Sequence, residues 1–205
     1  MYIIEYRKIP KKSILVFIII FINGILKSQD LNNNRIGIDL FGCQNVVANN
    51  DFNLSKSFHT ISGYQIGLTY VRLINDNIHF ETGIQFTNNY FRIDKSIELF
   101  NNYWKRLERK EVVGMPFSLI LQSSKGYFIS SGVQIDVEVN HWTKLLIDDQ
   151  SGIGFILSAG RNFHVSENLY MAFAPTCKIH SLVPISNEKV IEYGFKMNLL
   201  FGFLK

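Results

Sequence analysis

A two-residue alternation of apolar and polar side chains runs through this chain and is clearest in its last stretch, Val190 to Lys205. The odd positions of this stretch are all large and apolar: Tyr193, Phe195, Met197, Leu199, Phe201 and Phe203. The even positions are mostly small or polar: Glu192, Gly194, Lys196, Asn198, Leu200 and Gly202. Because side chains on a β-strand point alternately to opposite faces, the pattern predicts a strand with one wholly apolar face.

The same alternation recurs along the chain and predicts about eight strands of the length that tilted membrane strands need. Besides the last stretch, the predicted strands are Arg35 to Cys43, Ile61 to Arg72, Ile78 to Thr87, Val112 to Gln122, Tyr127 to Val139, Gly152 to Arg161 and Asn168 to His180. We therefore expect an all-β fold, a single antiparallel up-and-down transmembrane β-barrel.

The predicted connections alternate between long and short. The first long one is Gln44 to Thr60, and the second is the charged, aromatic segment Asn88 to Arg109, whose flanks are compatible with strands projecting beyond the membrane. With both ends of the barrel in the periplasm, every long loop lies outside the cell. This asymmetry is typical of bacterial outer-membrane barrels.

The apolar face is predicted to contact lipid. An eight-stranded lumen has room for few side chains, and the apolar faces carry too many large residues to fit inside it. The opposite faces are rich in Gly, Ser, Thr and Gln, whereas a water-facing exterior would be crowded with Lys and Glu. We accordingly expect Leu119 and Ile135 to face lipid, and Gln65 and Gln134 to face the lumen.

Aromatic residues lie near both expected membrane interfaces. They are Tyr64, Phe86 and Tyr193 toward the loop ends, and Tyr70, Phe80, Tyr127 and Phe203 toward the turn ends. Two aromatic girdles would explain this distribution. The alternative is the general preference of aromatic residues for strands.

The beginning of the chain has the features of a cleavable signal peptide. Basic residues precede the apolar run Ser13 to Leu26, and a run of about 14 residues is too short to span a bilayer comfortably. We expect cleavage after Ser28, which makes residues 1–28 the signal peptide and residues 29–205 the outer-membrane β-barrel domain. The alternative is an uncleaved membrane anchor.

The positive charge of the chain belongs to this leader. The formal net charge is +4 and the isoelectric point is about 9.0. Five basic residues and one acidic residue before residue 29 account for all of that charge, leaving 16 of each sign in the remainder. The basic isoelectric point therefore does not indicate a nucleic-acid partner.

Cys43 and Cys177 are placed on the first and seventh predicted strands, which the eighth strand separates in a closed barrel. Two strand spacings, roughly 9–10 Å, exceed the reach of a disulfide. We expect two free thiols that act as small apolar side chains.

No catalytic, cofactor-binding or metal site is indicated. The expected loops contain Ser57, His59, His141, Asp148, Asp149, His180 and Ser181, but no pattern fixes a nucleophile beside a base. The five histidines lack the spacing of metal ligands. We expect that the protein is not an enzyme.

The inward faces carry charges that must be paired if they are buried. They are Asp39, Glu81, Asp136, Glu138, Lys178 and Lys196. Because the first and last strands of a closed barrel are neighbours, Asp39 is the expected partner of Lys196, with Glu81 next across the lumen. The alternative is a water-filled lumen that solvates each charge separately.

Several stretches carry a resemblance to a known family. They are the leader, ETGIQFTNN (Glu81 to Asn89), VVGMPFSLIL (Val112 to Leu121) with Pro116, GIGFILSAG (Gly152 to Gly160) and the aromatic last strand. In these features the mature chain resembles the PorT-like outer-membrane β-barrel proteins of Bacteroidota. Such barrels usually end on an aromatic residue, whereas Leu204 and Lys205 follow Phe203 here. Some of these proteins serve secretion or gliding machinery, and the resemblance implies no site residue.

Two functions of different class remain open. The first is a small outer-membrane barrel with a structural, surface-interaction or secretion-machinery-associated role. The alternative is a transport or ligand-binding barrel for a small solute or lipid, although eight strands leave essentially no open channel. The expected partners are outer-membrane lipid, the barrel-assembly machinery during insertion and an unidentified protein, without nucleic acid.

Overall fold

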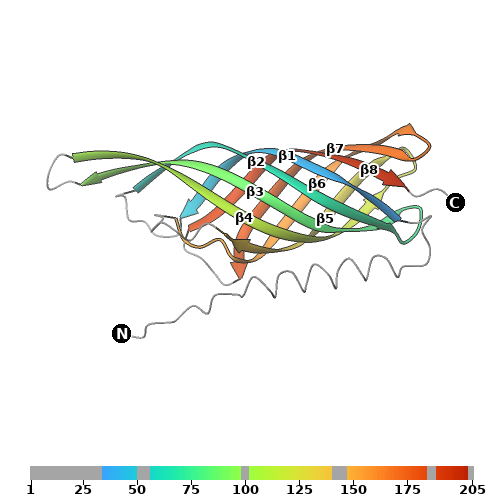
Figure 1. Cartoon of the computed structure of the whole chain (residues 1–205). Helices are drawn as coiled ribbons and strands as arrows, with labels where there is room; N and C mark the ends of the chain where they lie inside the picture. The colour runs from blue at the N-terminus through green and yellow to red at the C-terminus, as the bar shows by residue number, and fades with distance from the viewer. Residues whose placement is uncertain (1–33, 50–55, 98–101, 140–146, 184–187, 203–205) are drawn as a thin grey trace.

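The computed structural model describes residues 34–49, 56–97, 102–139, 147–183 and 188–202. The strands are β1 Asn34–Asn49, β2 Lys56–Leu73, β3 Ile78–Ile97, β4 Asn102–Gln122, β5 Tyr127–Glu138, β6 Gly152–Ser166, β7 Leu169–Val183 and β8 Glu188–Gly202. Each strand pairs with the next, and β1 pairs with β8, so that the predicted antiparallel eight-stranded barrel is confirmed (Figure 1). In the part described, no helix is long and apolar enough to cross a membrane. The expected signal peptide and Phe203 lie outside these ranges.

The strands are longer at the loop end than the alternation predicts. β1 reaches Asn49 and β2 begins at Lys56, so most of the expected loop Gln44 to Thr60 belongs to strands. Similarly, β3 and β4 take in nearly all of Asn88 to Arg109. Toward this end of the barrel the outward face meets water rather than lipid, so outward positions need not be apolar. Backbone pairing therefore continues there without an apolar–polar alternation to reveal it.

Two strands, β3 and β4, continue far beyond the end of β5, and β2 runs beside them. The β4–β5 ladder ends at the pair Val112–Glu138, whereas the β3–β4 ladder runs ten pairs beyond Val112, to Ile97–Asn102. Ten residues of strand span about 33 Å. β2 accompanies this extension as far as the pair Lys56–Lys95. Figure 1 shows the extension, hereafter the β2–β4 ribbon, as the long arm on the left.

The two faces of the barrel are as the sequence predicts. Leu119 and Ile135 are 53% and 42% exposed on the outer face, whereas Gln65 and Gln134 are each 2% exposed in the lumen. The predicted girdle residues Tyr64 and Tyr127 are also exposed on the outside. Tyr70 differs, because it is buried and its hydroxyl donates a hydrogen bond to Asn34 Oδ1 at 2.7 Å.

A β-bulge shapes the loop end of β7. The ladder to β6 shifts there, with Ile179 opposite Phe155 but Val183 opposite Ile153. Ser181 adopts φ = 51°, a left-handed conformation that is uncommon for residues other than glycine. The two extra residues that β7 has between these pairs let His180 and Ser181 both be buried. The expectation that these two residues open the last loop is wrong, because β7 continues to Val183.

Candidate functional site in the barrel lumen

The lumen is closed at both ends by apolar side chains. The periplasmic cap consists of Val71, Ile120 and Leu200 packed with Phe128 and Tyr170, and the extracellular cap of Phe91, Ile147 and Val190 packed with Val47. Leu200 and Val190 lie near opposite ends of β8, so the two caps are separated by most of that strand. The space between them contains polar and charged side chains.

Next to the periplasmic cap, Lys196 connects three strands across the seam where β1 meets β8. Its Nζ lies 3.2 Å from Asp39 Oδ2 on β1 and forms a second ion pair with Glu81 on β3. Gln65 Nε2 donates to the other Asp39 oxygen at 2.5 Å. All four side chains are buried. The predicted Lys196–Asp39 pair is confirmed, and Glu81, the second predicted partner, is engaged at the same time.

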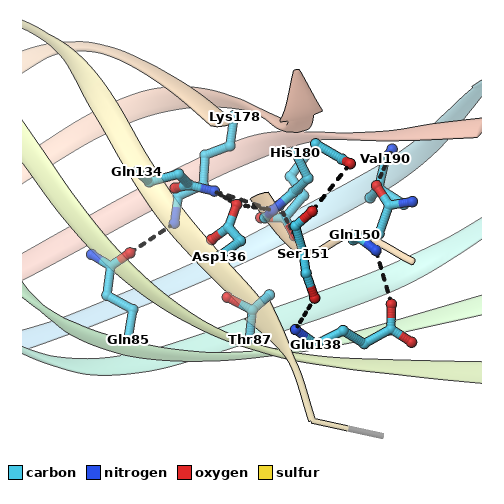
Figure 2. Close-up of polar contacts among 12 residues, drawn as sticks. Gln85, Thr87, Gln134, Asp136, Glu138, Gln150, Ser151, Lys178, His180 and Val190 are labelled. Carbon is cyan, nitrogen blue, oxygen red and sulfur yellow. Dashed lines mark hydrogen bonds and ion pairs between the residues drawn. The ribbon is translucent and has the colours of Figure 1, made fainter. Parts of the chain in front are cut away.

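Lys178 on β7 is buried with no carboxylate within ion-pair distance among the described residues. Its Nζ donates to Gln65 Oε1 and, at 3.0 Å, to Gln85 Oε1, the second of which is drawn in Figure 2. The nitrogen also lies 5.1 Å from the centroid of the Phe41 ring, within cation–π range. Amide oxygens and an aromatic ring therefore surround this cation in place of a counter-ion.

His180, turned inward beside the β7 bulge, bridges two carboxylates. Nδ1 lies 2.8 Å from Asp136 Oδ2 on β5, and Nε2 lies 2.8 Å from Glu192 Oε1 on β8. A ring protonated at both nitrogens suits this arrangement. Gln134 Nε2 donates to Asp136 at 2.7 Å, and Asn89 Nδ2 donates to Glu192 at 2.5 Å. Figure 2 shows Gln134, Asp136 and His180 converging inside the barrel.

Residues 147–151, which precede β6, fold back into the extracellular end of the lumen. Gln150 is 1% exposed; its backbone N–H donates to Glu138 Oε2 at 2.9 Å, and its Oε1 accepts from the Val190 N–H at 2.9 Å. Lys110 Nζ lies 2.8 Å from Glu138 Oε1. This inward segment therefore links the charged interior to the extracellular cap (Figure 2).

A small cavity lies among the interior charges. Beside Lys196 there is a cavity of about 10 Å³, lined in part by Ser130 and Ser158, which is about the room that one water molecule needs. The alternative of a water-filled lumen with separately solvated charges is wrong for the described residues, because those charges contact one another or amide groups directly.

Of the residues considered for catalysis, Ser181 and Asp149 lie close together, through a backbone carbonyl rather than the carboxylate, and the side chains of Ser57 and His59 are not among those that the structure describes. Asp149 accepts hydrogen bonds from Ser151, and Ser181 Oγ contacts backbone carbonyl oxygens of Asp149 and Ser151 at 3.5 Å. His141 lies outside the described residues. In the part of the chain that the structure describes, no three His, Cys, Asp or Glu side chains are grouped so as to hold a metal.

The cysteines are free, as predicted, but they have different surroundings. Cys43 is buried in the lumen, where its Sγ donates to Asn45 Oδ1 at 3.2 Å. Cys177 occupies an outward position next to Tyr193 of β8. The two thiols therefore lie on opposite sides of the barrel wall, and β8 also lies between their strands. The expectation of an apolar role is wrong for Cys43, which lies among polar groups.

The outer wall is covered by exposed apolar side chains. They include Ile38, Leu40, Ile66, Leu68, Leu119, Ile129, Val133, Leu157, Phe173 and Phe195. A water-soluble protein has a polar exterior and an apolar interior, whereas this barrel has an apolar exterior and a charged interior. Closure of the barrel pairs the strand edges of its wall with one another, as a bilayer requires. The protein is an outer-membrane β-barrel.

No family model matches the chain, and no curated protein matches it. Solved structures similar in fold include Neisserial surface protein A, at 12% identity and a TM-score of 0.48, covering 83% of this chain and 97% of that one. OprG from Pseudomonas aeruginosa is 15% identical with a TM-score of 0.44, covering 83% and 93%. Ail, the attachment invasion locus protein of Yersinia pestis, is 11% identical with a TM-score of 0.40, covering 82% and 99%. At these identities the likeness concerns the barrel architecture alone.

Proposed function

We propose that this protein is a small outer-membrane scaffold that presents the β2–β4 ribbon at the cell surface as a docking element for a protein partner. The observation that carries the proposal is the ribbon itself, ten residue pairs of β3 and β4 beyond the point where β5 leaves the sheet. Long extensions belong to the extracellular side of such barrels, and short turns to the periplasmic side.

The interior supports a scaffold rather than a transporter. Apolar caps close both ends, and the ion pairs of Lys196, His180 and Lys110 join strands across the space between them. A solute would have to break these buried pairs, and removing one partner of such a pair costs about 3–5 kcal/mol. The alternative of a barrel for a small solute or lipid is therefore disfavoured.

The resemblance to the PorT-like proteins of Bacteroidota refines the proposal. It supports a role beside secretion or gliding machinery, in which the barrel holds a larger assembly at the outer membrane. The barrel-assembly machinery would then be a transient partner during insertion, and outer-membrane lipid a permanent one. No part of this role requires catalysis.

A conductance measurement separates the scaffold from the transporter. The barrel, inserted in a planar lipid bilayer under an applied voltage, is expected to show no steady current, because the charged interior is packed and capped. A reproducible open-channel conductance from the folded barrel would contradict the scaffold proposal.

A shortened ribbon tests the docking role. Deleting residues 93–106 and joining Arg92 to Leu107 through Asn-Gly, which favours a tight hairpin turn, removes half of the ribbon but leaves the barrel wall intact. Boiled and unboiled samples of this variant are expected to migrate differently on a detergent gel, and this heat-dependent gel shift shows that the barrel is folded. The proteins that crosslink to the wild type in cells are expected not to crosslink to the variant. The control replaces only residues 98–101 by Asn-Gly and is expected to keep them. Unchanged crosslinking by the shortened ribbon would refute the docking role.

A further inference from the structure

One cation lies on the outer wall among aromatic rings, close to the periplasmic rim. Arg161 of β6 is exposed and pairs with Tyr127, the first residue of β5. Its Cζ lies 5.0 Å from the centroid of the Tyr127 ring and 5.1 Å from that of Phe163. Phe173 of β7 packs edge-on against Phe163, with centroids 6.2 Å apart. The guanidinium therefore contacts one ring on β5 and one on its own strand, and Phe173 of β7 supports the second ring.

Arg161 has no counter-ion from the described part of the protein, because no carboxylate lies within 4.0 Å of it. Its contacts with the two rings do not use its N–H groups as hydrogen-bond donors to oxygen, and no hydrogen bond joins these groups to the described residues. An arginine in this position at a membrane boundary attracts an anion, and its planar fork matches the oxygens of a phosphate. Exposed Lys125, in the turn before Tyr127, adds a second positive charge at the same rim.

The wall above Arg161 suits a hydrocarbon chain. Toward the membrane centre the outward side chains are Ala159 of β6 and Ile129 of β5, which pair with each other, followed by Leu157 and Ser131, which also pair. All four are exposed. Each of these two pairs joins a small residue, Ala159 or Ser131, to a large one, Ile129 or Leu157. The large residue is on β5 in the first pair and on β6 in the second, so this part of the wall has an uneven surface. None of the four residues carries a charge.

We propose that Arg161, held over Tyr127 and Phe163, binds the phosphate of a phospholipid in the periplasmic leaflet of the outer membrane, with an acyl chain lying over Ile129 and Ala159. The site is independent of the surface role proposed above, because it lies at the opposite end of the barrel. It would fix the depth and rotation of this side of the barrel in the membrane.

Native mass spectrometry of the detergent-folded barrel tests the site with dioleoyl phosphatidylglycerol as the probe. The wild type is expected to retain one more lipid than Arg161→Gln, and the apparent affinity of the variant is expected to be about ten- to a hundredfold weaker, as for the loss of hydrogen bonds to a charged group. A heat-dependent gel shift confirms that the variant is folded.

Arg72→Gln is the matched control. Arg72 is also an exposed arginine near the periplasmic end, but it has no ring contact in the described structure, so the change is expected to leave lipid retention unchanged. Dioleoylglycerol, which has the same chains without a phosphate, is expected not to be retained. Equal retention of phosphatidylglycerol by wild type and Arg161→Gln, equal loss from Arg72→Gln, or equal retention of dioleoylglycerol would each overturn the proposal.

Discussion

Replacing Lys196 by Met removes the cation that two buried carboxylates share. Asp39 is 0% exposed and Glu81 is 4% exposed, so neither can turn to water after the change. Removing one partner of a buried ion pair costs about 3–5 kcal/mol, because an uncompensated charge stays behind. Since two carboxylates are left behind here, we expect a loss near the top of that range.

Adding Asp39→Asn and Glu81→Gln to Lys196→Met removes the uncompensated charges. Neutral or apolar replacement of a whole buried ion cluster is often without net cost, so the triple variant is expected to recover more than half of the loss. The assay is urea unfolding of the barrel in lipid vesicles, with the heat-dependent gel shift as the measure of the folded fraction. With a slope of roughly 2 kcal/mol per molar urea, Lys196→Met is expected to lower the midpoint by about 2.5 M. Glu167→Gln, at an exposed turn, is the control and is expected to leave the midpoint unchanged. If the losses of the single variants simply add in the triple variant, the cluster does not stabilise the seam and this reasoning is refuted.

Two further predictions use the same unfolding assay. Val133→Arg, near the middle of β5 on the lipid face, is expected to lower the free energy of unfolding by about 2–4 kcal/mol. Ile74→Arg, in the exposed β2–β3 turn, is expected to change the midpoint little. Equal effects of the two changes would contradict the lipid-facing assignment of Val133. Gly37→Ala is expected to destabilise the barrel by about 1–3 kcal/mol, because the added methyl group would overlap the backbone carbonyl of Leu199. The control Gly42→Ala places a methyl group where no atom lies within 4 Å, so it is expected to be neutral or slightly stabilising. If Gly37→Ala is tolerated, β1 and β8 are not in such close contact.

The membrane part of the fold could be predicted from sequence because lipid on one side and a narrow lumen on the other impose the alternation. Leu119 and Gln134 have the predicted faces for that reason alone. The Lys196–Asp39 pair could be predicted because closure makes the last strand a neighbour of the first. The β2–β4 ribbon could not be delimited, since strands in water need no such alternation.

The rest of the interior depends on features that alternation does not contain. Gln150 comes from a connection rather than a strand, and only the folding-back of residues 147–151 brings it to Glu138. The place of His180 beside Asp136 and Glu192 follows from the stagger of the strands and the bulge at Ser181. The inward glutamines at positions 65, 85 and 134 were the available signal, because amides at inward positions indicate a hydrogen-bonded interior.

The seam cluster also bears on how the barrel is made. Asp39 belongs to the first strand, Glu81 to the third and Lys196 to the last, so no partly assembled sheet that lacks β8 can neutralise the two carboxylates with this lysine. Such a sheet would bring unpaired charges and two open edges toward hydrocarbon, both of which a bilayer penalises. Ring closure removes these penalties in one step. Insertion into the membrane is therefore expected to be cooperative. The first strand, β1, can be buried only once β8, which is synthesised last, has paired with it.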